Sequence, residues 1–157
     1  MTVSPDRKPV VVADLGEAID VVRRGGLRLT SARRLVLEAL LAAGGPISAE
    51  EIADGLGGRM TQSDIASVYR NLDTLGSIGL VRHFHAGHGP GRYVLESGDD
   101  REYLACDSCG KVESVDPAAL DGVRESVREL SGFEARFSHF PIIGRCPECA
   151  GGSAQNR

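Results

Sequence analysis

Two Cys-x-x-Cys motifs constrain this chain more than any other feature of its sequence. Cys106 and Cys109 form the first motif, Cys146 and Cys149 form the second, and 36 residues separate the two. Each motif places two thiolates on one tight turn, and two such turns supply the four ligands of a tetrahedral zinc ion. Because four thiolates leave no open coordination position, we expect one structural zinc ion per chain rather than a catalytic one. Two thioredoxin-like redox pairs or four unliganded buried cysteines are the alternatives.

Length and composition are typical of a soluble globular protein. The chain has 157 residues, of which 41% are hydrophobic and 25% are charged, so we expect one ordinary domain or two small ones. No apolar run approaches the roughly 18 residues that span a bilayer, and the first twelve residues lack the apolar core of a secretory signal. We therefore expect a cytoplasmic protein with no membrane partner. Thiols stay reduced in that compartment, which favours metal ligation over disulfides.

Charge is distributed unevenly between the two halves. Residues 1–90 carry ten basic and ten acidic side chains, whereas residues 91–157 carry eight and twelve, which gives the whole net charge of −4. Any contact with nucleic acid phosphates is therefore expected in the first half.

The first half has the element order of a winged helix-turn-helix domain. Apolar periodicity predicts helices over residues 13–24, 30–43 and 63–76, with Thr30 as an N-cap of the second. Ser48 and Glu51 form a capping box that begins a short helix between them. Two strands, residues 80–85 and 92–96, flank a loop of turn residues and complete the domain, which we place at residues 13–96.

The second half predicts a small β-β-α-β unit over residues 101–149, after a linker at 97–100. Strands are expected near 103–106, 111–115 and 133–144, with a helix that starts at Asp116 and Pro117. A unit of this size buries little core, so it needs a metal, a partner subunit, or both. With flexible tails at 1–12 and 150–157, the fold class is α+β: an N-terminal winged helix-turn-helix domain and a small C-terminal α/β dimerisation domain with a four-cysteine zinc site.

The helix over residues 63–76 is the candidate for the DNA major groove. Its stripe of Ile65, Val68, Leu72 and Leu75 leaves the opposite face free. The residues that we expect to contact bases or phosphates are Arg70, Tyr69, Ser67 and Gln62, with Arg28 and Arg34 as phosphate anchors. An ordinary solvated helix face is the alternative.

Histidines suggest a second metal site. His83 and His85 are two residues apart on a predicted strand, so both imidazoles project from one face while Phe84 points to the other. His88 lies in the following loop, and His139 lies on the predicted last strand. The alternative is three unrelated histidines, one in the core and two on the surface of the wing.

Several segments together resemble the ferric uptake regulator family of metal-responsive repressors. They are residues 27–34, 47–52, 67–75 and 78–83 and the two cysteine motifs, and the resemblance covers residues 13–149. Residues 83–89 and 139–146 look most like the nickel-responsive branch, in which histidines at the positions of His83, His85 and His139 bind the sensed metal. The resemblance implies a homodimer that, when loaded with metal, binds double-stranded operator DNA with an inverted repeat.

The chain also departs from the family pattern. Family members usually carry a run of histidines before the first cysteine motif, and this chain has residues 98–104 there instead. Pro46 likewise stands where a histidine is often found. Glu96, Asp100 and Glu102 are then candidate oxygen ligands. A mixed nitrogen and oxygen site suits zinc, nickel or iron about equally.

The sequence thus predicts a metal-dependent DNA-binding repressor of metal homeostasis or oxidative-stress genes, and not an enzyme. One regulatory ion on His83, His85 and His139 would fix the angle between the two DNA-binding domains of a dimer. A small zinc hydrolase is the first alternative, with the three histidines as ligands and Glu102 as base. A constitutive zinc-stapled interaction module is the second.

Overall fold

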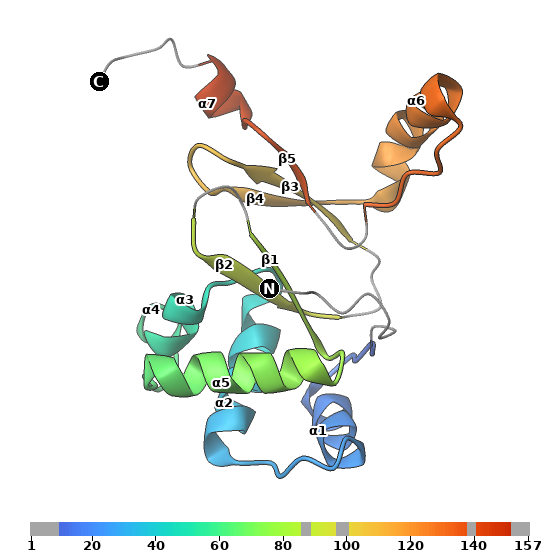
Figure 1. Ribbon diagram of the computed structural model, residues 1–157. Coiled ribbons are helices and arrows are strands. Elements are labelled where there is room, and N and C mark those ends of the chain that lie inside the picture. Colours follow the sequence, from blue (N-terminus) through green and yellow to red (C-terminus); the bar gives the residue numbers. More distant parts are fainter. Residues whose placement is uncertain (1–9, 86–88, 97–100, 138–140, 152–157) are drawn as a thin grey trace. The chain divides into compact units, whose positions relative to one another are not determined.

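The computed structural model describes residues 10–85, 89–96, 101–137 and 141–151 (Figure 1). The chain divides into two compact units. The first contains residues 1–83 and 91–99, and the second contains residues 84–90 and 100–157. Within the described part of the chain, no helix has both the length and the apolar character needed to cross a membrane.

The first unit has the predicted order of helices followed by a hairpin. Its elements are α1 (Leu15–Arg24), α2 (Ser31–Ala43), α3 (Ala49–Ala53), α4 (Gly55–Gly58), α5 (Ile65–Ser77), β1 (Val81–His85) and β2 (Gly91–Leu95), of which β1 runs on into the second unit. Thr30 accepts a hydrogen bond from the Arg33 amide and caps α2, as predicted. The Ser48 capping box is also confirmed: the Glu51 amide donates to Ser48 Oγ at 3.1 Å, and Glu51 Oε2 accepts from the Ser48 amide at 2.7 Å.

The core of this unit joins the helices to the base of the hairpin. Leu37, Ile52, Leu72 and Leu80 are fully buried in it. Val12 belongs to the same core at 1% exposure, and its amide donates to the Glu96 carbonyl at 2.9 Å. The expectation of a flexible tail over residues 1–12 is therefore wrong for its C-terminal end, because an apolar side chain and a backbone hydrogen bond hold that end in place.

The turn between α3 and α5 has an unpredicted left-handed conformation. Gly55, Leu56, Gly57 and Gly58 all have positive φ, between 54° and 86°. A Cβ on Gly55 would lie 2.2 Å from the Met60 carbonyl oxygen, so only glycine fits there. The Met60 amide donates to the Gly55 carbonyl at 2.8 Å and closes the turn ahead of α5.

The second unit is built on a three-stranded sheet of order β4-β3-β5. Its elements are β3 (Glu102–Cys106), β4 (Val112–Val115), the 3-10 helix η1 (Pro117–Leu120), α6 (Asp121–Ser131), β5 (Ile142–Gly144) and α7 (Pro147–Gly151). β3 pairs antiparallel with β4 and parallel with β5. As predicted, Asp116 caps the helical segment and Pro117 is its first residue.

Two expectations about the end of the chain are wrong. The predicted strand over residues 133–144 is limited to 142–144, because residues 133–137 have no strand pairing and 138–140 lie outside the described residues. The tail expected from residue 150 begins with helical residues, since α7 extends to Gly151 and the Ala150 amide donates to the Cys146 carbonyl at 2.8 Å.

Helix α6 leaves its apolar stripe uncovered. None of its residues is buried, and Leu130 is 88% exposed, Val123 43% and the following Phe133 73%. The apolar side chains at helical spacing here are Leu120, Val123, Val127 and Leu130, and Leu120, just before α6, is the one of them that is buried. The second unit by itself therefore has a much smaller apolar core than the first, as its size predicts.

Candidate metal centre and nucleic-acid interface

Parallel pairing of β3 with β5 brings the two cysteine motifs together. Cys106 ends β3 opposite Gly144, which ends β5, and the Asp107 amide donates to the Gly144 carbonyl at 2.9 Å. The first motif lies on a turn in which the Gly110 amide donates to the Cys106 carbonyl at 3.0 Å. The second motif spans the first turn of α7. The 36 intervening residues thus return the chain to its starting point, as predicted.

The four cysteine sulfurs have the geometry of a tetrahedral metal site. Their Sγ atoms all lie within 4.8 Å of one another, and Cys109 Sγ is 3.8 Å from Cys146 Sγ. A zinc ion with four sulfurs at about 2.3 Å separates those sulfurs by about 3.8 Å. Among the described residues, these four cysteines form the group of potential metal ligands that lies close enough together to hold one ion.

The thiols of this cluster differ in their affinity for protons. Amide hydrogen bonds, first from Cys146 at 3.4 Å and then from Cys109, lower the pKa of Cys106 to about 6. Hydrogen bonds with the other cysteine side chains, above all with Cys146, raise the pKa of Cys149 to about 12. Four thiolates so close together repel one another, so full ionisation of the cluster requires a cation at its centre.

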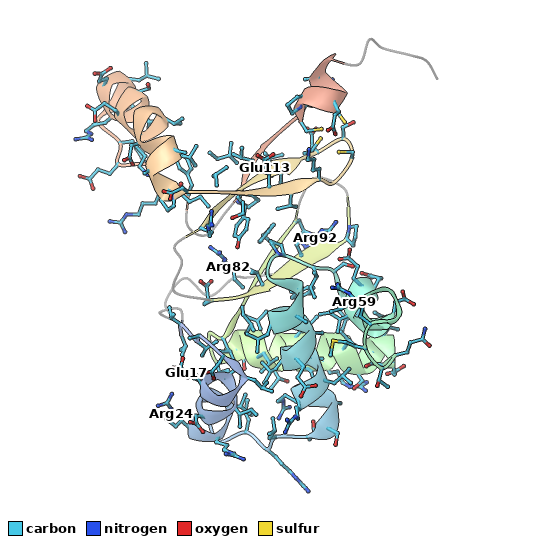
Figure 2. All side chains as sticks on the ribbon, turned by 180° about the vertical axis from the view of Figure 1, so that it is seen from behind. Glu17, Arg24, Arg59, Arg82, Arg92 and Glu113 are labelled. Carbon is cyan, nitrogen blue, oxygen red and sulfur yellow. The ribbon has the colours of Figure 1, made fainter. Side chains whose placement is uncertain are left out.

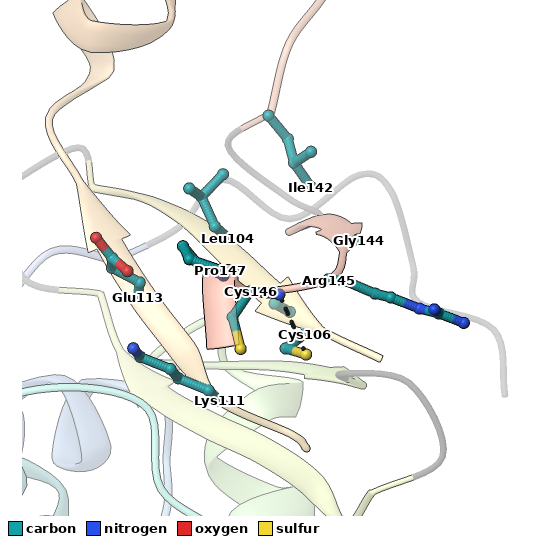
Figure 3. A pocket seen from close by; sticks show the side chains of 10 residues that line it. Leu104, Cys106, Lys111, Glu113, Ile142, Gly144, Arg145, Cys146 and Pro147 are labelled. Carbon is teal, nitrogen blue, oxygen red and sulfur yellow. Dashed lines mark hydrogen bonds between the residues drawn. The ribbon is translucent and has the colours of Figure 1, made fainter. Parts of the chain in front are cut away.

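A pocket of about 230 Å³ lies beside the cysteine cluster (Figure 3). Leu104, Ile142 and Pro147 contribute apolar side chains, and Lys111, Glu113 and Arg145 contribute charges of both signs. None of the ten lining residues is a histidine, a serine or a threonine. Neither His83, His85 nor Glu102, the described residues of the zinc hydrolase alternative, lines this pocket, so the pocket gives that alternative no support.

The structure describes two of the histidines proposed as metal ligands. His83 and His85 lie on β1 and flank Phe84, which is buried and stacks on Tyr103 with ring centroids 5.5 Å apart. His83 is half-buried and stacks on Tyr93 at 4.4 Å, whereas His85 is exposed. Both project from the face opposite Phe84, as strand alternation requires. His88 and His139 lie outside the described residues.

The candidate carboxylate ligands that the structure describes are paired with arginines. Glu96 Oε1 lies 3.1 Å from Nε of Arg82, and Glu102 Oε1 accepts a hydrogen bond from Arg124 Nη2. Asp100 lies outside the described residues. Glu96 and Glu102 thus each pair with a guanidinium group.

Helix α5 presents the predicted polar face. Val68, Leu72 and Leu75 are buried, while Ile65 is 38% exposed because it stands in the first turn of the helix, outside the packed stripe. The side chain of Arg70 is 74% exposed, and its Nη2 is 4.0 Å from Asp64 Oδ2. An exposed pair at this distance contributes little, so Arg70 is free to contact a ligand.

Tyr69 has a partner that the sequence did not indicate. Its hydroxyl donates to Glu50 Oε1 at 2.8 Å, which links α5 to the first turn of α3. The hydrogen bond raises the pKa of Tyr69 and lowers that of Glu50. Of the other candidates on this segment, Ser67 is half-buried, and Gln62 Nε2 lies 3.4 Å from Asp54 Oδ1.

The predicted phosphate anchors differ in their surroundings. Arg34 Nε pairs with Glu38 Oε1 at 2.7 Å across one turn of α2, and the side chain of Arg28 is exposed. Arg92, on β2 of the hairpin (Figure 2), pairs with Glu51 at 2.9 Å and ties the wing to α3. That contact joins residues 41 positions apart, so no local sequence pattern predicts it.

Known proteins are similar to this chain in sequence and in fold. Residues 24–140 match the model of the ferric uptake regulator family. The peroxide operon regulator of Bacillus subtilis is 28% identical over 137 residues, which cover 87% of this chain and 94% of that protein. The ferric uptake regulator of Helicobacter pylori has a TM-score of 0.67 at 21% identity, covering 92% of this chain and 99% of that one. A zinc uptake regulator complexed with zinc and DNA has a TM-score of 0.50 at 27% identity, covering 87% and 93%.

The family match spans most of the chain, including the elements from α2 to β2 and the first cysteine motif. The chain therefore belongs to the ferric uptake regulator family.

Proposed function

We propose that this chain is a metal-responsive DNA-binding repressor of transcription. Its family membership supports a regulator rather than an enzyme, and its relatives include a peroxide operon regulator and a zinc uptake regulator complexed with DNA. The observation that carries the proposal is helix α5, which buries one face in the core of a winged helix-turn-helix unit and exposes Arg70 on the other.

In this proposal α5 enters the major groove of the operator. Arg70 donates to a guanine edge or a phosphate, and Tyr69 contacts a thymine methyl from the position where Glu50 holds its ring. Ser67 and Gln62 lie on the same segment as short-range donors. The guanidinium groups of Arg28 and Arg34 bind phosphates and thereby fix the position of the helix along the duplex.

A homodimer would place two such helices on an inverted repeat. The exposed stripe of α6, with Leu130 at 88% and Val123 at 43%, supports an apolar partner surface in the second unit. β5 is an edge strand of the sheet, and its Ile143 is 54% exposed. We assign these surfaces to a second copy of the chain, because a two-fold dimer matches the symmetry of an inverted-repeat operator.

Two metal ions per chain complete the proposal. Zinc at the four cysteines is structural, since the cluster is closed and fits a tetrahedral ion. A second divalent ion, zinc, nickel or iron, would be held by His83, His85 and His139 and would restrict the chain to the conformer that binds DNA. The resemblance to the nickel-responsive branch remains a prediction, as does control of metal homeostasis or oxidative-stress genes.

The placement of α5 is tested by two arginine substitutions. Arg70→Ala should cost about 1–3 kcal/mol of binding free energy for a base contact and relax the sequence preference. Arg34→Ala, at a proposed phosphate contact, should weaken binding to all sequences alike. Fluorescence anisotropy with operator and scrambled duplexes, at one fixed salt concentration, measures both effects. Unchanged affinity and preference in Arg70→Ala would show that a different element occupies the groove.

A further inference from the structure

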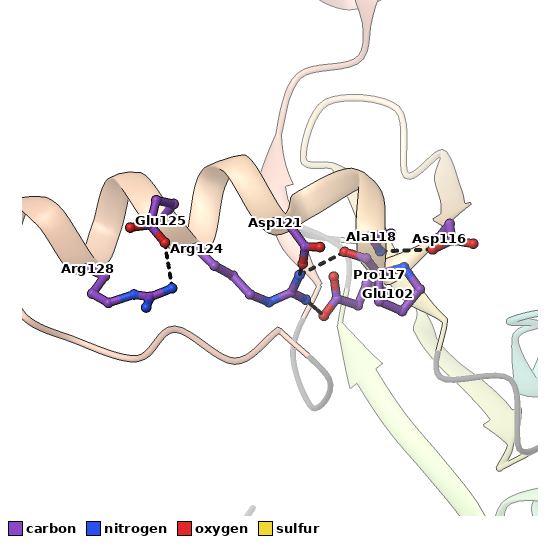
Figure 4. Close-up of polar contacts among 8 residues, drawn as sticks. All are labelled: Glu102, Asp116, Pro117, Ala118, Asp121, Arg124, Glu125 and Arg128. Carbon is purple, nitrogen blue, oxygen red and sulfur yellow. Dashed lines mark hydrogen bonds and ion pairs between the residues drawn. The ribbon is translucent and has the colours of Figure 1, made fainter.

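The guanidinium of Arg124 lies among oxygen atoms from three residues (Figure 4). Its Nη1 donates to the Pro117 carbonyl at 2.7 Å and to Asp121 Oδ1 at 2.9 Å, and its Nη2 donates to Glu102 Oε1. The ring of Phe137 stacks against the same group, with its centroid 5.5 Å from Arg124 Cζ. One cation thus connects β3, η1 and α6 with the segment that follows α6.

Glu102 is the most buried carboxylate in this cluster. Its side chain is 6% exposed, compared with 23% for Arg124 and 73% for Asp121. Glu102 Oε2 has no hydrogen-bond partner among the described residues, and Arg124 is the cation that pairs with the group there. A buried carboxylate needs such a cation, because an unpaired charge inside the protein is costly.

These contacts decide between a metal ion and an arginine at Glu102. A carboxylate ligand would have to direct its oxygens to the metal, and a guanidinium group already bonded to one oxygen repels a second cation at that position. Four groups surround this planar cation. The two carboxylates and the carbonyl accept hydrogen bonds from the N–H donors of the guanidinium, and the aromatic ring covers its face. Of the oxygen ligands expected from the sequence, Glu102 therefore fits a guanidinium group better than a metal ion.

We infer that Arg124 takes the place of a metal ion in the second unit and anchors α6 to β3 without one. The chain thereby has no carboxylate-based sensory site at Glu102, and the position of α6 on its own sheet is independent of added metal. Metal response is then restricted to other ligands of the chain. The inference does not depend on DNA binding, because it is measured by metal content and by local stability.

Glu102→Gln tests the assignment directly. The substitution preserves the shape of the side chain and one acceptor for Arg124, so the protein is expected to fold. Mn²⁺ content of the full-length protein is measured by equilibrium dialysis and elemental analysis, with zinc counted in the same samples. We expect identical Mn²⁺ and zinc content in Glu102→Gln and the wild type. Loss of one equivalent of Mn²⁺ per chain in Glu102→Gln would overturn the inference.

Arg124→Ala provides the second arm, and Arg128→Ala is its matched control. Arg128 lies one helical turn further along α6 and pairs only with the exposed Glu125 among the described residues. Amide hydrogen exchange of residues 117–131 should become faster in Arg124→Ala and stay near the wild-type rate in Arg128→Ala. In the wild type, the exchange of this segment should be the same with and without Mn²⁺. Equal exchange in the two variants would contradict the anchoring role of Arg124.

Discussion

The two units of this chain obtain their stability from different sources. Among its described residues, the first buries eighteen hydrophobic side chains in one cluster, drawn from helices α1 to α5, the hairpin and the adjoining Val12 and Leu80. In the second, the buried apolar residues among those described are Phe84, Tyr103, Ala105, Cys106 and Leu120. Burial of apolar surface stabilises the first unit, whereas the second must be stabilised by contacts of other kinds.

Three kinds of contact can stabilise the second unit. The cysteine cluster joins the ends of β3 and β5, and Arg124 joins β3 to α6. The exposed stripe of α6 offers a third, contact with a second copy of the chain. A small unit with a weak core can therefore depend on an ion and on assembly for its fold, which suits a protein that responds to metals.

Loss of the cysteine-bound metal should have the largest effect on stability, and it should destabilise the second unit only. Cys106→Ser should release about one zinc per chain and unfold the second unit, because structural zinc contributes on the order of 10–16 kcal/mol to folding. The first unit should stay folded on its own core. Zinc content and amide exchange of β3 compared with α2 measure the two outcomes, with Ser114→Ala, at an exposed position of β4, as control. Full zinc retention in Cys106→Ser would contradict the four-sulfur site.

Leucine-to-alanine substitutions in the two units should have smaller effects of different kinds. Leu72→Ala in the first core should cost about 2–5 kcal/mol of unfolding free energy, because it leaves a cavity around a fully buried side chain. Leu130→Ala should leave the unfolding of the monomer almost unchanged and weaken the dimer instead. Urea unfolding at several protein concentrations and sedimentation velocity separate these effects. An equal, concentration-independent loss in both variants would mean that Leu130 packs within its own chain.

Local patterns in the sequence predicted most of the first unit and the position of the cysteines. Caps such as Thr30 and Ser48 marked helix starts correctly, because the hydrogen bonds of a cap join residues three apart. The cysteine spacing predicted a shared site, because each motif forms one turn. β3 and β5 then pair in parallel and bring the two turns together.

Features that depend on contacts beyond one helical turn could not be predicted in the same way. The Met60 carbonyl, five positions further on, leaves no room for a Cβ on Gly55, and the next residue, Leu56, also has positive φ. Glu102 was a candidate metal ligand from the sequence because nothing local shows that Arg124, 22 positions away, is its partner. The joint histidine site remains a prediction, since His139 lies outside the described residues.

The most direct test of a metal-responsive repressor compares His83→Ala with His139→Ala in metal-dependent DNA binding. Anisotropy of an operator duplex is titrated with zinc, nickel or iron, with His88→Ala as the control from the neighbouring loop. We predict that both substitutions abolish the response to metal and leave the cysteine-bound zinc and the dimer intact. His88→Ala should reduce the response less than either of them. A normal metal response in His139→Ala, or operator binding by the wild type that needs no exchangeable metal, would contradict the account.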